Sequence, residues 1–495
     1  MNLSAALDTP SPLHQAMPKQ MALYYGGQWH PPLGGKTPTV NPATGEVLAL
    51  APNANAEDVD RVAQAAQLGF HAWSGLPAAE RGARLREIAN RLRKHADELA
   101  LLDSANCGNP IKRMRPDAHQ AAAQIDYYAG LVHELKGETI PTADGGLNYS
   151  VREPLGVVAR IVAYNHPLLF LAGKLAPVLA AGNSVIMKAP DQAPLSALRF
   201  AEIIDGILPP GVLNVLTGGR ECGEALVRHP LVKKVALIGS VPTGAAILRG
   251  AADKIMPVTL ELGGKNPLII CPDADLEKAV PGAINGMNFT WAGQSCGSTS
   301  RLFVHASLYD QVIKALCEKL PQLHRCGLPT DPDTTMGCLI SEAQFNKVMD
   351  YIELGKSEGA RLIYGGKRPD DPALDKGWFV EPTVFADVTP QMRIFREEIF
   401  GPVLSVIPWN DEDQLVQDIN SVDYGLSASI YTQDLTRAHR LARRVEAGYV
   451  WINTSSAHYI GANFGGYKRS GMGREEGLDE LLSYTQVKNV HVLLG

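Results

Sequence analysis

Apolar residues recur at helical spacing early in the chain. Between them lie Arg, Lys and Glu, and the apolar positions are Leu85, Ile88, Leu92, Leu99 and Leu102. This spacing places apolar side chains on one face of a helix. The pattern predicts a single amphipathic helix over residues 77–102.

From Gly156 onward the pattern changes, and short β-rich runs alternate with helical stretches. A first series predicts strands at residues 157–163, 184–187, 213–217 and 234–238, with helices at 194–207 and 223–228. A second series predicts strands at residues 267–270, 301–304, 404–407 and 427–431. This alternation is typical of βαβ units and parallel sheets. The expected fold is α/β, with two doubly wound domains and two short edge segments at 147–153 and 482–494.

Composition narrows the function classes. The chain has 495 residues, 45% hydrophobic and 20% charged, with a net charge of −6. These values are ordinary for a globular protein and favour neither a nucleic-acid nor a membrane-surface partner. We see no apolar run long enough for a bilayer and no signal peptide. A cytoplasmic protein with a loosely packed tail over residues 1–20 is expected.

The seven cysteines are irregularly spaced and form no zinc-type cluster, so no metal site is expected. One of them stands among small residues, in Gly293-Gln-Ser-Cys296-Gly297. A carboxylate 35 residues earlier has a similar setting, in Glu261-Leu-Gly-Gly-Lys265. A thiol attacks carbonyl carbon, and a carboxylate can take a proton from water, so the pair suits covalent chemistry at an acyl carbon.

Together these two motifs resemble the aldehyde dehydrogenase superfamily. Further motifs follow in the family's order: Asn165-His-Pro167, Lys188-Ala-Pro-Asp191, residues 209–214, Gly239-Ser240, residues 397–402 and residues 464–468. The resemblance implies a dinucleotide-binding domain of residues 21–140 and 156–262 and a catalytic domain of residues 263–470. Residues 141–155 and 480–495 would form a bridging region through which a homodimer or homotetramer assembles, although a plain edge hairpin is the alternative.

The resemblance also implies the cofactor residues. Lys188 and Asp191 would bind the adenosine ribose, while Gly239 and Ser240 would face the pyrophosphate from a strand-to-helix turn. Ser240 could instead be a simple helix cap. A carboxylate at 191 repels a 2′-phosphate, which favours NAD while leaving NADP possible. The remaining members of the expected cofactor set are Glu398, Phe400, Leu262 and Tyr164.

By the same resemblance Cys296 is the nucleophile, Glu261 activates water, and the Asn165 amide stabilises the oxyanion. Lys174 and Glu475 match positions linked to proton movement and support of the site. A CoA-acylating enzyme, a non-redox thiol hydrolase and a structural protein on the same fold are the alternatives. Glu261 as a base for water opposes the first, the cofactor motifs oppose the hydrolase, and the intact Cys296, Glu261 and Asn165 oppose the structural protein.

Substrate preference is the weakest inference from the sequence. The expected substrate-lining set is His166, Phe170, Gly173, Trp291, His458, Tyr459 and Phe464, with Leu169 and Asn453 nearby. Gly173 stands where many family members carry an aromatic residue, which predicts a wider entrance. His166 and Gly173 break the aromatic cage that a quaternary ammonium needs. No Arg stands at these positions to bind a carboxylate, so an uncharged aliphatic or aromatic aldehyde is expected.

Overall fold

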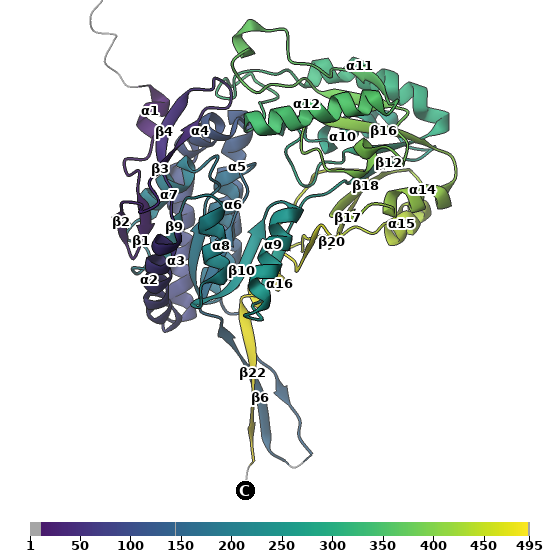
Figure 1. Ribbon diagram of the computed structural model, residues 1–495. Coiled ribbons are helices and arrows are strands. Elements are labelled where there is room, and N and C mark those ends of the chain that lie inside the picture. Colours follow the sequence, from purple (N-terminus) through teal and green to yellow (C-terminus); the bar gives the residue numbers. More distant parts are fainter. Residues whose placement is uncertain (1–10, 144, 494–495) are drawn as a thin grey trace, which may run out of the picture.

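Two sheet-containing lobes and a projecting arm make up the molecule (Figure 1). The computed structural model describes residues 11–143 and 145–493. The first lobe contains an eight-stranded sheet in the order β2-β1-β9-β8-β7-β10-β11-β21. Its strands are β1 Leu23–Tyr25, β2 Gln28–His30, β7 Val157–Ile161, β8 Ser184–Lys188, β9 Leu213–Leu216, β10 Val232–Ile238, β11 Val258–Glu261 and β21 Gly471–Met472.

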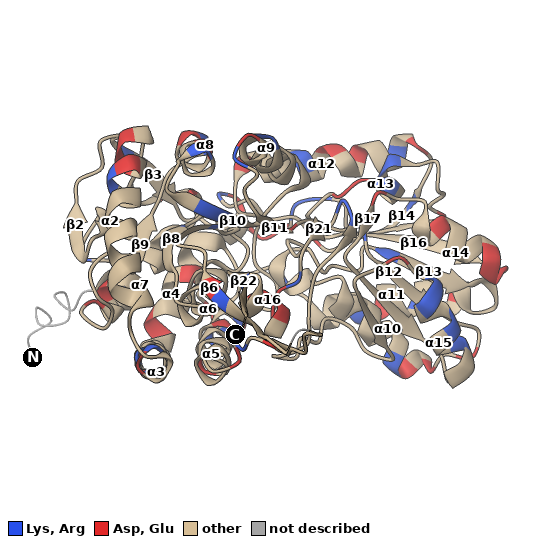
Figure 2. Ribbon diagram, turned by 90° about the horizontal axis from the view of Figure 1, so that it is seen from below, with Lys and Arg blue, Asp and Glu red and all other residues tan. Residues whose placement is uncertain are grey.

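The middle of this sheet is parallel and doubly wound. From β7 the chain adds β8 and then β9 on one side, and returns to add β10 and then β11 on the other. Helices α8 and α9 lie on one face, and α5 and α6 lie on the other (Figure 2). The helices of this lobe are α2 Ala56–Ser74, α3 Ala78–Lys94, α4 Ala96–Cys107, α5 Ile111–Gly130, α6 Pro167–Ala180, α7 Leu195–Ile204, α8 Arg220–Arg228 and α9 Val241–Ala252.

The single helix predicted over residues 77–102 is wrong. The segment breaks at His95, whose φ of −109° and ψ of 13° end α3, and α4 begins at Ala96. Leu85, Leu92 and Leu99 pack into a core beneath α5 and α6, and Leu102 packs with Ala16 and Leu195. The apolar periodicity therefore continues across the break, which is why the pattern did not reveal it.

The loosely packed tail predicted for residues 1–20 is also wrong where the structure describes it. Helix α1 spans Pro12–Ala16, and the Ser11 side chain caps it by accepting from the His14 N–H. Ala16 is buried against Leu102. Residues 1–10 lie outside the described residues. Two strands, β3 Lys36–Val40 and β4 Val47–Pro52, form a separate hairpin nearby.

The second lobe has a seven-stranded sheet in the order β14-β15-β16-β13-β12-β18-β19, in which only β14 runs antiparallel. Its strands are β12 Pro267–Ile270, β13 Arg301–His305, β14 Arg361–Tyr364, β15 Thr383–Ala386, β16 Val403–Trp409, β18 Ser427–Tyr431 and β19 Tyr449–Ile452. Around it lie α10 Leu276–Gly286, α11 Tyr309–Leu323, α12 Glu342–Ser357, α13 Arg393–Arg396, α14 Glu412–Asn420, α15 Leu435–Arg444 and three short 3₁₀ turns, η1 Phe289–Trp291, η2 Ala306–Leu308 and η3 Pro372–Leu374.

The arm is a three-stranded antiparallel sheet in the order β22-β6-β5. It consists of β5 Thr139–Ile140, β6 Leu147–Pro154 and β22 Thr485–Val492, and α16 Leu478–Leu482 leads into it. A further pair, β17 Tyr424–Gly425 and β20 Tyr467–Lys468, lies between the lobes (Figure 1). None of the helices that the structure describes has the length and apolarity to cross a membrane.

Candidate active site

Glu261 and Cys296 lie where the two sheets join. Glu261 ends β11 of the first sheet, and residues 262–266 connect it directly to β12 of the second. Asn266 ties this connection to the cysteine loop, because its Nδ2 donates to the carbonyls of Cys296 at 2.7 Å and Ser298 at 3.0 Å. The two chemical residues are therefore positioned by one junction.

The cysteine loop needs its small residues. Asn288 and Ala292, on either side of η1, have left-handed φ angles of 58° and 50°, and Gly293 has a φ of 69°. A Cβ at Gly293 would lie 2.1 Å from the Gly401 carbonyl oxygen. Gln294 fixes the loop from the other side by donating to the Cys338 carbonyl and accepting from the Ile340 N–H. Strain of this kind is concentrated at functional sites.

The surroundings of both chemical groups favour their uncharged forms. Burial raises the pKa of Glu261 well above its usual value, the negative charge of Glu475 adds to the effect, and Lys174 partly opposes it. Neither Glu261 carboxyl oxygen has a hydrogen-bond partner in the structure. Burial, with Glu261, Glu398 and Glu476 nearby, raises the pKa of the Cys296 thiol to about 12. A buried, unpartnered carboxyl beside a thiol is typical of a reaction site.

A network of buried charged side chains lies beside Glu261. Lys174 Nζ lies 3.0 Å from Glu475 Oε2 and 3.6 Å from Glu480 Oε2, and Arg160 lies 2.7 Å from Glu475 Oε1. Burial alone would raise the pKa of Glu475, but the charges of Arg160 and Lys174 hold it at about 2. Tyr128 completes the network by donating to Glu480 at 2.7 Å.

Asn165 follows β7 and lies two residues before the start of α6, whose N-cap is His166. Its backbone carbonyl accepts from Asn109 Nδ2 at 2.7 Å, which fixes the turn. The residue is 4% exposed, and its side-chain amide makes no hydrogen bond to any residue that the structure describes. An amide held in place with free donors can stabilise a developing negative charge.

The first sheet provides a crevice of the kind that binds nucleotides. Strand order reverses between β7 and β10, and in open α/β sheets ligands bind beyond the carboxyl ends of strands at such a reversal. Tyr164 and Asn165 follow β7, and Gly239 and Ser240 follow β10. Ser240 caps α9 by accepting from the Thr243 N–H at 3.4 Å, so the capping alternative is realised. The cap does not exclude an anion at the helix N-terminus.

The other expected cofactor residues flank the same crevice. Lys188 ends β8, is buried, and makes no ion pair within the described part of the chain, while Asp191 is exposed three residues later. Glu398 accepts from the Gly264 N–H at 3.0 Å. A Cβ at Gly263 would lie 2.1 Å from Glu398 Oε2, so a side chain there would displace the Glu398 carboxylate. The chemistry of these polar groups fits a dinucleotide.

Aromatic and apolar groups complete the cofactor set. The Tyr164 and Phe400 rings meet edge to face at a centroid distance of 6.0 Å, which brings elements of the two lobes together. Phe400 has a left-handed φ of 56°. Leu262 is buried beside the α9 helix, and its side chain closes on Gly244.

Most of the expected substrate-lining set clusters around aromatic contacts. His166 lies 5.4 Å from the Phe170 ring and 5.3 Å from the Trp291 ring, and His458 lies 4.8 Å from Phe464. Tyr459, by contrast, is 65% exposed. Leu169 is half-buried and packs on the first lobe's core, and Asn453 donates to the Thr432 carbonyl.

The wider entrance predicted from Gly173 is not observed. Gly173 is buried, and a Cβ there would lie 2.2 Å from Gln124 Oε1. The Gln124 side chain, supplied by α5, therefore fills the space that a larger residue at 173 would occupy. Sequence reasoning missed this because Gln124 is separated from Gly173 along the chain and becomes its neighbour only when α5 packs on α6.

Three other residues near the site escaped sequence reasoning. Asp117 Oδ2 lies 2.6 Å from His166 Nδ1, and Glu476 Oε2 lies 3.3 Å from His458 Nδ1. Arg113 lies over the Trp291 ring at 6.0 Å. Only Glu476 carried a local signal, since it follows Glu475 in the sequence.

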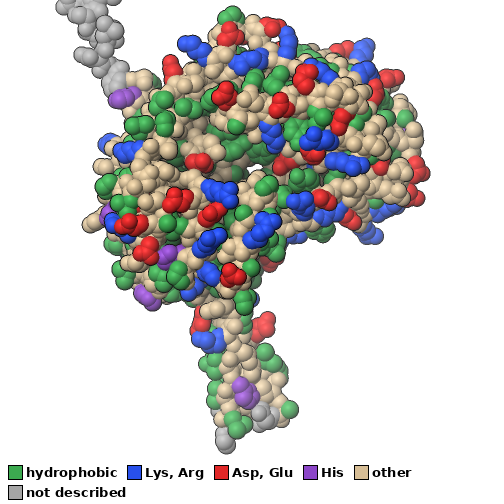
Figure 3. Space-filling model, viewed as in Figure 1, with side chains coloured by type: hydrophobic (Ala, Val, Ile, Leu, Met, Phe, Trp, Pro, Cys, Tyr) green, Lys and Arg blue, Asp and Glu red, His purple; other side chains and the backbone are tan. Residues whose placement is uncertain are grey.

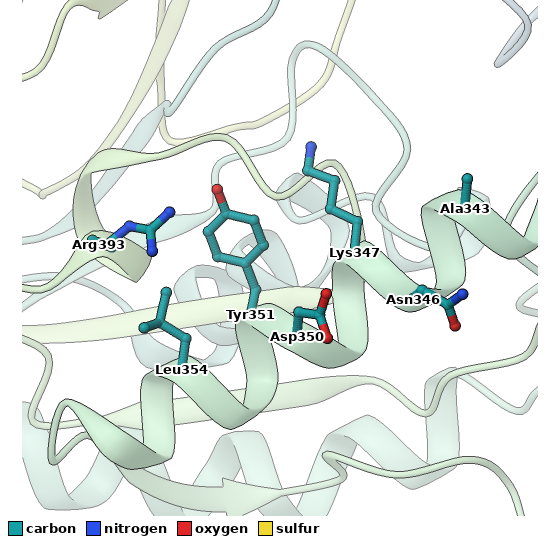
Figure 4. A pocket seen from close by; sticks show the side chains of 7 residues that line it. All are labelled: Ala343, Asn346, Lys347, Asp350, Tyr351, Leu354 and Arg393. Atoms are coloured by element: carbon teal, nitrogen blue, oxygen red, sulfur yellow. The ribbon is translucent and has the colours of Figure 1, made fainter.

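A surface hollow of about 500 Å³ lies away from the thiol, along one face of α12 (Figure 4). Arg393 borders it, together with Ala343, Asn346, Lys347, Asp350, Tyr351 and Leu354. The hollow approaches the candidate site only through Lys347, whose Nζ donates to the Glu398 carbonyl at 3.2 Å. Among the described residues no group of three or more His, Cys, Asp or Glu side chains is arranged to hold a metal ion.

Comparisons with known proteins agree with this geometry. The model of the aldehyde dehydrogenase family matches residues 29–490. Aldehyde dehydrogenase tropH of Talaromyces stipitatus is 50% identical over 491 residues, which are 98% of this chain and 95% of the relative.

Solved structures show the same similarity. The NAD⁺ complex of an aldehyde dehydrogenase from Bacillus cereus is 39% identical with a TM-score of 0.94, over 98% of this chain and 99% of that one. The betaine aldehyde dehydrogenase of Staphylococcus aureus in complex with NAD⁺ is 35% identical with a TM-score of 0.94, over 97% and 96%. The α/β fold predicted from the sequence is confirmed, and the chain belongs to the aldehyde dehydrogenase family.

Proposed function

We propose that the protein oxidises an aldehyde to a carboxylic acid with NAD⁺, through a covalent adduct on Cys296. The observation that carries this proposal is the junction that holds the Cys296 thiol and the unpartnered Glu261 carboxyl together. In the first step the Cys296 thiol passes its proton to solvent, and its sulfur adds to the aldehyde carbon. The oxyanion that forms is stabilised by the Asn165 amide and the Cys296 backbone N–H.

A nicotinamide bound in the crevice would supply the hydride acceptor, and the Cys296 adduct would then become a thioester on the sulfur. Glu261 then removes a proton from water, the water oxygen adds to the thioester carbon, and the carbon–sulfur bond breaks to release the acid and the thiol. Lys174 and Glu475, next to Glu261, support that proton transfer by position and charge.

The cofactor would lie across the reversal between β7 and β10. Lys188 and Asp191 would bind the adenosine ribose, Gly239 and Ser240 the pyrophosphate, and Glu398 the nicotinamide ribose. The NAD⁺ complexes of the Bacillus cereus and Staphylococcus aureus relatives support NAD as the cofactor. Tyr164, Leu262 and Phe400 would contribute packing.

We also propose assembly through the arm. Figure 3 shows hydrophobic side chains along it, whereas charges of both signs are scattered over the lobes. The exposed apolar residues of the arm are Ile140, Leu147, Val487, Val492 and Leu493. A protruding sheet with free edges and apolar side chains is suited to pairing with a second copy of the chain. A homodimer or homotetramer would result.

The test is reduced nicotinamide formation, measured by absorbance with short, long and aromatic aldehydes, with NAD⁺ or NADP⁺, and with or without CoA. CoA-independent formation with NAD⁺ is expected. Cys296→Ala should abolish it while leaving NAD⁺ binding intact, because the cofactor residues lie elsewhere. Cys317→Ala, which changes a half-buried thiol of the second lobe, is the matched control and should retain activity. Activity in Cys296→Ala would overturn the nucleophile.

A further inference from the structure

Two histidines in the substrate-lining set are each held by a carboxylate. His166 Nδ1 contacts Asp117 at 2.6 Å, and His458 Nδ1 contacts Glu476 at 3.3 Å. A carboxylate only accepts hydrogen bonds, so each Nδ1 is a donor. Within the described residues neither Nε2 makes a hydrogen bond. Each ring is therefore fixed in orientation with one nitrogen left available.

Both histidines belong to the surroundings of the reacting groups. His166 directly follows Asn165, and its ring meets Trp291, five residues before Cys296. His458 packs on Phe464, and a Cβ on the next residue, Gly465, would lie 2.9 Å from Glu261 Oε1. One histidine thus stands on the Asn165 side of the site and the other on the Glu261 side.

Helix α5 contributes a further polar group to this region. Gln124 is 6% exposed, and its Oε1 has no hydrogen-bond partner. It faces Gly173 of α6, two helical turns beyond the contact between Asp117 and His166. A buried carbonyl oxygen without a partner costs stability unless a ligand supplies a donor. Flat aromatic rings from Phe170, Trp291 and Phe464 lie among these polar atoms.

We propose that the substrate is an aromatic aldehyde bearing hydroxyl groups, and that His166 and His458 determine this specificity. The inference rests on the proposed aldehyde oxidation. A hydroxyl donates to Nε2 of a neutral imidazole, and an ionised hydroxyl accepts from a charged one. Asp117 and Glu476 are positioning residues that act through the histidines. The left-handed φ of 68° at Glu476 is the kind of strain retained at functional positions.

An aldehyde without hydroxyls would leave the half-buried His166 Nε2 and the buried Gln124 Oε1 without a partner among the described residues, whereas His458 is exposed to water. A site built to bind a hydroxyl discriminates strongly against the analogue that lacks it. Arg113, over Trp291, could bind the carboxylate of a substrate instead, and it is exposed as His458 is, but it stands outside the two histidine–carboxylate pairs. A carboxylated aldehyde is therefore the competing outcome of the test.

The experiment compares kcat/KM for benzaldehyde, the three hydroxybenzaldehydes and para-carboxybenzaldehyde with NAD⁺ saturating. The wild-type enzyme should prefer at least one hydroxybenzaldehyde over benzaldehyde by about tenfold or more. His166→Phe and His458→Phe should each reduce that ratio by about tenfold, and taking the ratio within each variant cancels any loss that is common to all the aldehydes. His166→Gln keeps a hydrogen-bonding group beside Asp117 and should preserve part of the ratio.

His119→Phe is the matched control, because His119 is exposed on α5 two residues from Asp117. It should leave the ratio unchanged. Equal kcat/KM for benzaldehyde and all hydroxybenzaldehydes, a preference for the carboxylate, or a hydroxyl preference that survives both substitutions would overturn the specificity. Should His166→Phe fail to fold, His458→Phe and His166→Gln decide the matter. Oxidation of aliphatic aldehydes alone overturns the specificity but not the function, whereas no oxidation of any aldehyde overturns both.

Discussion

The Cys296 thiol, proposed as the nucleophile, lies in an environment that opposes its ionisation. Burial and nearby carboxylates raise its pKa to about 12, so at neutral pH it is protonated in the cofactor-free protein. Because the thiolate is the reactive form, alkylation by iodoacetamide should accelerate about tenfold per pH unit between about pH 7 and pH 9. The measurement is the rate of modification at Cys296, read by peptide mass spectrometry. A rate independent of pH would show that the thiol is already ionised.

Glu261→Gln separates the two halves of the reaction. The amide has the shape of the carboxyl but cannot take a proton from water, so acyl-enzyme should accumulate while its hydrolysis slows by about 10²–10⁴-fold. Mass spectrometry of the intact protein after mixing with aldehyde and NAD⁺ detects the adduct. Glu353→Gln, on the exposed face of α12, is the control. Unchanged turnover in Glu261→Gln would remove the carboxyl from the mechanism.

At the scale of single residues, the sequence predicts the candidate reacting residues better than it predicts the side chains that contact them. Cys296 and Glu261 stand in short motifs with diagnostic neighbours, and the structure brings them to one junction. Asp117 and Gln124 lie on a helix whose sequence shows only ordinary amphipathic character. Their contacts with His166 and Gly173 depend on how α5 packs on α6, which is a long-range property that no local pattern encodes.

At the scale of the elements, the segment between β21 and α16 carries Glu475, which forms ion pairs with both Arg160 and Lys174. Glu475→Gln should destabilise the fold by about 3–5 kcal/mol, because Arg160 and Lys174 would remain buried with less compensation. Urea unfolding near neutral pH measures the change. Glu353→Gln, which removes an exposed pair with Lys356, should alter stability by less than about 1 kcal/mol. Equal effects in the two variants would contradict the role assigned to burial.

The Glu475 carboxylate also predicts how the stability of the protein depends on acid pH. Its pKa of about 2 is below the ordinary value of 4.5, so its stabilising contribution is complete above about pH 4.5 and is lost as the pH falls toward 2. The wild-type advantage over Glu475→Gln in free energy of unfolding should therefore shrink over that interval. An advantage that stays constant on acidification would assign the difference to another cause.

These strand positions were predictable because burial on both faces favours short runs of apolar and small residues. The segments 267–270 and 427–431 match β12 and β18 residue for residue, and 213–217 overshoots β9 by one. The helix predicted over 77–102 failed because the apolar periodicity continues across His95, where the backbone leaves helical geometry. Apolar periodicity identifies the buried side of a helix but does not show where the helix ends.

At the scale of the whole molecule, the arm carries apolar side chains that remain exposed within a single described subunit. Val487→Asp should weaken assembly, because Val487 is 59% exposed on β22 and a charge there opposes apolar contact between copies. Light scattering during gel filtration would show a smaller species. Leu435→Asp places the same charge at a site 70% exposed on α15 and should leave the assembly intact. An unchanged mass for Val487→Asp would exclude that position from the contact.

The pairing of β22 with β6 also orders events during synthesis. These strands are joined by a register from Thr485↔Pro154 to Val492↔Leu147, so their partners are more than 300 residues apart in the chain. β21, Glu475 and Glu480 also follow the parallel strands of both sheets in the sequence. During synthesis the arm and the buried charges beside Glu261 are therefore incomplete until residues 471–492 have been made. A chain terminated before residue 471 would lack both features, although the parallel strands of both sheets would be present.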